Sequence, residues 1–181
     1  MIECQDVSFS YPASTLPDSE RQAGGALKHI SCTIEDGSFV LLCGTSGCGK
    51  TTMTRLFNGL IPHYHEGTYT GSVYLDGKDT RDLSLFDISL KVGSVFQNPR
   101  SQFFNVDTTS ELAFGPENHG MAEDVVRDSV KRVAAQLKLE PLLDRSIFSL
   151  SGGEKQKIAC GSAAAIDPDV YVLDEPSSNL D

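Results

Sequence analysis

The chain has 181 residues, 39% of them hydrophobic, and a formal net charge of −10 at pH 7. This length allows one domain with a core of its own. No apolar run approaches the roughly 20 residues that cross a bilayer as a helix. The N-terminal residues MIECQDVSF lack the basic and apolar regions of a secretory signal. The acidic balance disfavours nucleic acid as a partner, because phosphate backbones are bound by clustered Lys and Arg.

The chain contains five cysteines, an odd number, and none of them forms a C-x-x-C pair. Neither a disulfide framework nor a zinc site is therefore indicated. A reducing cytosol is the simplest setting for such a chain, and we expect a cytoplasmic protein.

The N-terminal residues alternate between polar and apolar positions. Residues 1–11 therefore predict a strand in which Val7, Phe9 and Tyr11 share one face. Residues 13–25 are rich in Ser, Pro and Gly and predict a loop.

A glycine-rich segment follows the next apolar run. Phe39 to Cys43 predicts a strand, and GTSGCGKTT comes directly after it at Gly44 to Thr52. Strand, glycine-rich turn and helix start form the order that a phosphate-binding loop requires. Glycines let successive backbone N–H groups face one anion, and the following helix directs its positive dipole end there. We expect Lys50 to bind the β- and γ-phosphates and the Thr51 hydroxyl to bind Mg²⁺.

A plain glycine-rich turn is the alternative interpretation of this segment. The candidate nucleotide-binding residues are Gly44, Thr45, Ser46, Gly47, Cys48, Gly49, Lys50, Thr51 and Thr52. Apolar residues at helical spacing follow and predict a helix with one buried face; they are Met53, Leu56, Phe57 and Leu60.

Further elements follow in chain order. Gly71 to Lys78, GSVYLDGK, predicts a hairpin strand with an Asp-Gly turn. Lys91 to Phe96 predicts a short strand that runs into a turn at Gln97-Asn98-Pro99. Four apolar residues then predict a helix with one buried face; they are Val126, Val130, Val133 and Leu137.

The segment LSGGEKQ, Leu150 to Gln156, predicts a helix start with a capping box. In that motif Ser151 caps the helix and Glu154 reaches back to it. The box does not explain Gly152-Gly153, which lower helix propensity. Two glycines at a helix N-terminus are useful where a phosphate must approach the backbone closely.

The segment VYVLDEP, Val170 to Pro176, predicts a strand buried on both faces that ends in two carboxylates. The carboxyl ends of strands are where α/β proteins bind ligands. Because adjacent strand residues point to opposite faces, both carboxylates serve one site only if the chain turns at Glu175. Asp174 would then hold Mg²⁺ through water, and Glu175 would orient or deprotonate the attacking water. Two solvated carboxylates at a strand end are the alternative.

Together these motifs, in the order GTSGCGKTT, LSGGEKQ, VYVLDEP and SSNLD, make the chain resemble an ATP-binding-cassette (ABC) ATPase over essentially its whole length. The signature LSGGEKQ distinguishes this family from other NTPases, because phosphate loops alone occur in many unrelated NTPases. The resemblance implies an α/β fold of the P-loop NTPase type, with a mainly parallel core sheet, an antiparallel β subdomain and an inserted helical subdomain. It places the nucleotide-binding core and β subdomain at residues 1–98 and 167–181, and the helical subdomain with the signature at 99–166.

The resemblance also implies site roles, with ATP and Mg²⁺ as cofactors. Tyr11 in FSYP matches the aromatic residue that stacks on adenine, although core packing fits its spacing equally well. Gln97 matches the glutamine that contacts Mg²⁺ and the attacking water. A head-to-tail dimer with a second ABC ATPase subunit, identical or different, is implied, and residues 178–181 match the loop that crosses to that partner. The signature residues that would face the partner's ATP are Ser151, Gly152, Gly153 and Glu154.

A narrower resemblance lies in FSYP, QNPRSQFFN and ELAFGPEN, which are similar to the cobalt-type and energy-coupling-factor ATPases that drive uptake of vitamins and metal ions. It implies an ATP-hydrolysing importer subunit on the inner face of the cell membrane. Its partners would be a transmembrane coupling subunit and a substrate-binding membrane subunit. Phe103, Phe104 and Phe114 would receive coupling helices if exposed and would be ordinary core if buried.

One departure from the family concerns a histidine near the γ-phosphate, which the family carries on a further strand. All four histidines here precede Asp174, so none matches it. That further strand lies, in the family, between the two catalytic strands. We therefore expect that a C-terminal part of the domain is missing and that the chain as given hydrolyses ATP weakly or not at all. Two alternatives stay open: a non-transport ABC ATPase that acts mechanically or in translation, and a nucleotide-binding fragment that does not hydrolyse ATP.

Overall fold

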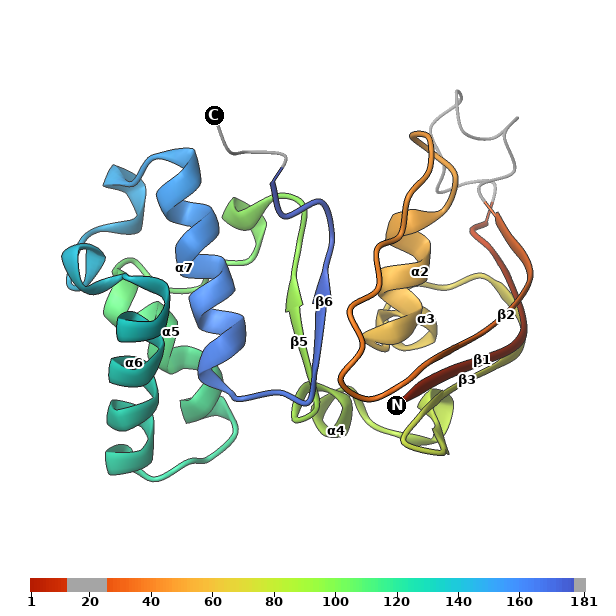
Figure 1. The fold of residues 1–181 in the computed structure, drawn as a ribbon, viewed down its shortest axis with the longest axis horizontal. Helices are drawn as coiled ribbons and strands as arrows, with labels where there is room; N and C mark the ends of the chain where they lie inside the picture. The colour runs from red at the N-terminus through yellow and green to blue at the C-terminus, as the bar shows by residue number, and fades with distance from the viewer. Residues whose placement is uncertain (13–25, 178–181) are drawn as a thin grey trace. The chain divides into compact units, whose positions relative to one another are not determined.

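A computed structural model describes residues 1–12 and 26–177, and Figure 1 shows the chain as a ribbon. The loop expected at 13–25 and the partner-crossing segment expected at 178–181 lie outside the described residues. The chain divides into two compact units, Met1–Ser89 and Leu90–Asp181. The division expected from the sequence, a core around an inserted helical subdomain, stays a prediction.

The first unit contains an antiparallel sheet in the order β2-β1-β3-β4. Its strands are β1 (Ile2–Ser10), β2 (Ala26–Ile34), β3 (Thr68–Leu75) and β4 (Lys78–Asp79). β1 pairs with β2 on one side and with β3 on the other, as Figure 1 shows at the right of the view. The Asp-Gly hairpin expected after Leu75 is confirmed by the pairing of β3 with β4.

The polar and apolar alternation of β1 shifts by one residue in the middle of the strand. Cys4 and Val7 are both buried, although they are three positions apart. Asp6 between them has φ of 50°, and the register with β2 and β3 shifts there. An extra residue of this kind is a β-bulge, which returns the later side chains to the core face. Val7 and Phe9 share that face as the sequence predicts.

The helix after the phosphate-binding loop is confirmed as α2 (Lys50–Phe57). Its buried residues include Met53, Leu56 and Phe57, which are spaced as one face of a helix. The helix ends at Asn58, and Gly59 starts the next short element. The other helical elements of this unit are α3 (Leu60–His63), η1 (Thr80–Asp82) and α4 (Leu85–Ser89).

The strand expected at Phe39 to Cys43 is not formed, which corrects the sequence prediction. No strand is assigned to these residues, and Phe39 and Leu41 are 91% and 73% exposed. A strand is stable when its backbone groups pair with a neighbour and its apolar side chains are covered. Within the described residues no strand pairs with this run.

The second unit combines a helical bundle with two parallel strands, β5 (Val92–Val95) and β6 (Val170–Leu173). Figure 1 shows α5, α6 and α7 packed together beside these strands. The helices are α5 (Thr108–Asn118), α6 (Glu123–Leu137) and α7 (Gly152–Ala165), with short 3₁₀ turns η2 (Pro99–Ser101), η3 (Glu140–Leu142) and η4 (Ile147–Ser149). Their shared apolar core includes Leu112, Val133, Leu139 and Ile158.

Strand β6 is buried on one face only, although the sequence predicts burial on both. Val172 is buried, whereas Tyr171 and Leu173 are 51% and 44% exposed. Alternate strand residues point to opposite faces, so one face of β6 is covered and the other is open. β5 pairs with β6 along its whole length, and α7 packs on β5 within the same unit.

Close packing between α5 and α7 depends on Gly161, and this gives a stability prediction. A Cβ at Gly161 would lie 2.7 Å from Leu112 Cδ2 and 2.8 Å from Leu139 Cδ1, two fully buried side chains with little room to move. Alanine gains about 1 kcal/mol of helix propensity over glycine, but overpacking costs about 1–3 kcal/mol. We expect Gly161→Ala to lower the free energy of unfolding by up to about 2 kcal/mol in urea titrations.

The control is Asp128→Ala at an exposed position of α6, which should change the free energy of unfolding by less than about 0.5 kcal/mol. A more stable Gly161→Ala protein would show that helix propensity outweighs packing at this site.

Candidate functional site

The glycine-rich loop folds the ammonium group of its lysine back onto its own first residues. Lys50 Nζ donates to the carbonyl oxygens of Gly44 at 3.1 Å and Thr45 at 3.2 Å. Gly47 and Gly49 have φ of 77° and 100°, a left-handed backbone that residues with a Cβ rarely adopt. The loop therefore has the backbone conformation that the glycine spacing predicts, with a full positive charge held beside it.

The start of α2 has neither a capping side chain at its N-cap position, Gly49, nor an acidic residue in its first turn. The positive end of the helix dipole thus meets no carboxylate from its own helix, which suits an anionic ligand. The thiol of Cys48 lies against Gly44, where an added Cβ would come within 2.4 Å of Sγ. This loop fits a nucleoside triphosphate by its charge and its backbone.

Tyr11, the candidate for adenine stacking, lies just after the end of β1 and is half-buried. Its ring meets Phe9 edge to face, with centroids 4.9 Å apart and planes at 89°. Its hydroxyl accepts a hydrogen bond of 2.8 Å from Arg55 Nη1 on α2. Tyr11 is thus in the same unit as the phosphate-binding loop, and its role in base stacking stays a proposal.

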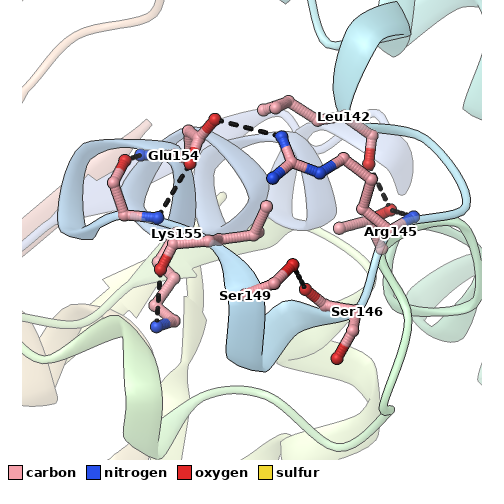
Figure 2. Close-up of polar contacts among 9 residues, drawn as sticks. Leu142, Arg145, Ser146, Ser149, Glu154 and Lys155 are labelled. Carbon is pink, nitrogen blue, oxygen red and sulfur yellow. Dashed lines mark hydrogen bonds and ion pairs between the residues drawn. The ribbon is translucent and has the colours of Figure 1, made fainter.

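The capping box at the start of α7 is confirmed. The Ser151 hydroxyl accepts from the Glu154 amide at 3.3 Å, and the Ser151 amide donates to Glu154 Oε2 at 2.8 Å. That backbone donor, together with the hydroxyl, holds the pKa of Glu154 below its ordinary value. Figure 2 shows the other carboxylate oxygen of Glu154 facing Arg145, whose Nη1 lies 3.3 Å away. The signature helix therefore has a start whose side chains are fixed by hydrogen bonds and charge.

The lysine of the signature has a structural contact that the sequence analysis did not identify. Lys155 is buried, and its ammonium group donates to the carbonyl oxygen of Leu150 at 2.8 Å, as Figure 2 shows. A buried ammonium needs such a partner, because an unpaired charge in the interior is costly. The contact ties the last residue before the helix to its first turn.

The end of β6 brings two candidate catalytic residues together. The amide of Asp174, whose side chain is buried, donates to the carbonyl oxygen of Val95 at 2.9 Å and so extends the pairing with β5. Glu175 has φ of 46°, so the chain turns there as the sequence predicts. Gln97 Nε2 donates to Glu175 Oε2 at 2.8 Å. The candidate water-contacting glutamine and the candidate base are therefore in direct contact.

The candidate Mg²⁺ ligands are distributed over both units. Thr51 belongs to the first unit, and Asp174 and Gln97 belong to the second. Within the described residues, no group of three or more His, Cys, Asp and Glu side chains could hold a metal ion alone. Mg²⁺ commonly takes one or two carboxylates with phosphate oxygens and water, so this donor set fits a nucleotide-bound ion better than a separate metal centre.

A glutamine missed by the sequence analysis fixes the loop after Gln97. The amide of Gln102 donates to the Ser94 carbonyl at 3.2 Å and accepts from the Phe96 N–H at 3.1 Å. β5 uses the carbonyl oxygens of Lys91 and Val95 to pair with β6, and successive residues of a strand direct their hydrogen bonds to opposite edges. Gln102 therefore occupies the other edge of β5 with both halves of its amide.

A glutamate fixes the far end of the same loop. Glu111 is almost fully buried in α5, and its Oε2 accepts from the amides of Phe104 at 3.0 Å and Asn105 at 2.8 Å. A buried carboxylate with several donors is stable where a lone one is not. Neither Gln102 nor Glu111 has a periodicity or spacing that could have singled it out in the sequence.

Comparison with known proteins identifies the family. The profile of the ABC transporter family matches residues 27–178. The chain belongs to the ABC transporter family. An ATP-binding protein of Treponema denticola assigned to ABC transporters is 49% identical over 181 residues, all of this chain and 35% of its own length. One from Pyrococcus horikoshii is 45% identical over 184 residues and is covered over 61% of its length.

Solved structures show the same fold. The structure of cbiO1 from Clostridium perfringens, part of the ABC transporter complex cbiONQ, has a TM-score of 0.79 and 27% identity, with 99% of this chain and 67% of that chain covered. The ATP-binding cassette MJ0796, solved as a dimer bound to ADP and Pi, has a TM-score of 0.80 and 24% identity over all of this chain and 76% of that one. The expected ABC ATPase fold, with its antiparallel β subdomain, is confirmed.

The chain spans about a third of the length of several of these relatives, as the 35% coverage shows. Members of this family bind ATP. Among the described residues of this chain, no helix is long and apolar enough to cross a membrane.

The position of the Lys50 ammonium group gives a binding prediction. Lys50→Ala removes the one full positive charge of the loop sequence, and charge-assisted hydrogen bonds contribute about 1.5–3 kcal/mol each. We expect ATP affinity to fall by at least about tenfold to a hundredfold in a fluorescent-nucleotide titration. Lys131→Ala, which removes the same charge from an exposed position of α6, should bind normally. Equal affinity of Lys50→Ala and the unmodified protein would contradict the site assignment.

Proposed function

We propose that this chain is the ATP-binding part of an ABC importer of the energy-coupling-factor type, which dimerises head to tail and hydrolyses ATP to power uptake. The contact between Gln97 and Glu175, 2.8 Å, supports this proposal most directly. The two residues are 78 positions apart, and the sequence analysis expects each of them, separately, to act on the attacking water. A merely structural pair of strand-end carboxylates would not need this partner.

In the proposed mechanism the loop around Lys50 binds the triphosphate, and Thr51, Gln97 and Asp174 are the residues that would hold Mg²⁺. The metal would supply charge neutralisation at the phosphate oxygens. Glu175 accepts the proton of the attacking water. The Gln97 amide orients the Glu175 carboxylate through its hydrogen bond.

The second half of the nucleotide site would come from a partner subunit. The signature residues Ser151 to Glu154 are fixed by the capping box and Arg145, so they form a rigid edge that suits a partner's phosphates. MJ0796 was solved as a dimer, which supports such an arrangement here. The partner would be a second copy of this chain or a related ABC ATPase subunit.

The importer type is supported by an aromatic pair in which Phe104 is exposed and Phe114 is half-buried. Phe104 is 74% exposed and stacks on Phe114, with centroids 4.8 Å apart and planes at 14°. Phe103, in contrast, packs against the apolar core of its unit. We assign Phe104 and Phe114 to contact with a transmembrane partner and Phe103 to the core. The likeness to cbiO1, part of an ABC transporter complex, supports a transporter role. A location on the inner face of the membrane and a vitamin or metal ion as cargo are proposed from the resemblance of the sequence motifs.

The proposed role of Glu175 predicts that its substitution lowers ATP turnover without weakening ATP binding. In a full-length version of the protein, Glu175→Gln keeps an oxygen that accepts from Gln97 but loses the basic carboxylate. We expect ATP turnover to fall by about 10²–10⁴-fold, while ATP affinity stays within about twofold and an ATP-bound dimer accumulates. Phosphate release and size-exclusion chromatography with ATP measure the two effects. Unchanged turnover would show that another group is the base.

The importer assignment is tested by association with membrane subunits. The tagged protein, purified in mild detergent from its own organism, should bring integral membrane subunits with it, and Phe104→Ala with Phe114→Ala should remove them. Phe148→Ala, which changes a phenylalanine that is 79% exposed in η4, is the matched control and should retain them. Purification with ribosomes or RNA instead would favour the non-transport alternative.

A further inference from the structure

Among the described residues, Tyr11 lies beyond the paired part of strand β1. The last paired residue of β1 is Ser10, which faces Ala26 on β2 and Thr68 on β3. Tyr11 follows it outside any strand. The direction of its ring therefore depends on side-chain contacts, not on strand pairing.

The contact that fixes the hydroxyl end of this ring comes from α2. Arg55 Nη1 donates to Tyr11 Oη at 2.8 Å, and the guanidinium carbon lies 5.9 Å from the ring centroid. The guanidinium group thus bonds the hydroxyl end of the ring and also makes a cation–π contact with it. Both groups are half-buried, which strengthens a hydrogen bond to a charged donor.

The rings that contact Tyr11 meet it edge to face and do not stack parallel to it. Within the described residues, Phe9 and His65 meet Tyr11 with planes at 89° and 86°, and both contacts are edge to face. Burial, with repulsion from Arg55, lowers the pKa of His65, so the charge beside the ring at neutral pH is that of Arg55. Among the described residues, no ring is parallel to Tyr11 and in competition with a planar base.

Helix α2 connects this ring to the phosphate-binding loop. Lys50 is the first residue of α2 and Arg55 is five residues later in the same helix, about 7.5 Å along its axis at 1.5 Å per residue. We infer that Arg55 is a positioning residue for the nucleotide base: it fixes the Tyr11 ring as the stacking surface, while the start of the same helix binds the phosphates. This inference rests on the proposed binding of ATP.

The test separates the base from the phosphates by comparing ATP with inorganic tripolyphosphate. Arg55→Met keeps an apolar stem and loses the donor, and Tyr11→Phe keeps the ring and loses the acceptor. We expect each change to weaken ATP binding by about 3- to 10-fold, a part of what stacking on an aromatic ring contributes. Tripolyphosphate affinity should stay within about twofold.

The double variant decides whether Arg55 acts through Tyr11. If it does, Arg55→Met combined with Tyr11→Phe should bind ATP no more weakly than Tyr11→Phe alone, because the two changes remove one interaction. In turnover assays KM for ATP should rise with kcat unchanged. Additive losses would overturn the inference, since Arg55 would then act elsewhere.

Controls distinguish this role from folding and from the proposed function. Arg55→Lys keeps the charge, and we expect it to lose less ATP affinity than Arg55→Met. Arg81→Met alters a second arginine beside a tyrosine, Tyr69, in the same unit, and should leave ATP affinity unchanged. Equal loss of tripolyphosphate binding in Arg55→Met would overturn the inference, because α2 itself would be disturbed. If the unmodified protein bound neither ligand, the proposed function would fail and the inference with it.

Discussion

The site depends on how the first backbone N–H groups of two helices are satisfied. Such groups have no partner within their own helix and need a side chain, water or ligand. At α2 the N-cap is Gly49 and the first turn has no acidic residue, so the helix offers its donors and dipole to an anion. At α7 the capping box of Ser151 and Glu154 satisfies donors internally. The two helix starts therefore differ: α2 has donors available for an anion, whereas the donors of α7 are bonded within its own capping box.

This contrast explains why the two glycine-rich segments have different neighbours. The loop before α2 carries a lysine whose ammonium group lies on the carbonyl oxygens of Gly44 and Thr45, where it adds positive charge to the helix end. The segment before α7 carries Lys155 turned inward onto Leu150 and Arg145 paired with Glu154. Those cations stabilise the segment and its capping carboxylate. The charge beside α2 thus favours an anionic ligand, and the charges beside α7 stabilise the helix start.

The sequence predicted those elements whose signal is local. Helices α2 and α6 follow the spacing of their own apolar residues, the start of α7 and its capping box follow from Ser151 and Glu154, and the turn at Glu175 follows from the need to bring two carboxylates together. The run from Phe39 and the second face of β6 were predicted wrongly, because the burial of a strand depends on neighbours that lie elsewhere. The sequence did not single out three polar residues, because a single polar residue has no periodicity; they are Arg55, Gln102 and Glu111. Their importance follows only from which backbone or side-chain atoms they contact.

The same isolated side chains connect the chemistry of the site to its surface. Gln97 lies at one end of a short loop and Phe104 at the other. Gln102 attaches this loop to the edge of β5 opposite β6, and Glu111 attaches its far end to α5. These hydrogen bonds satisfy backbone groups that a short loop cannot pair by itself. Gln97 and Phe104 therefore lie at the two ends of one segment that is bonded to a strand and to a helix of the same unit.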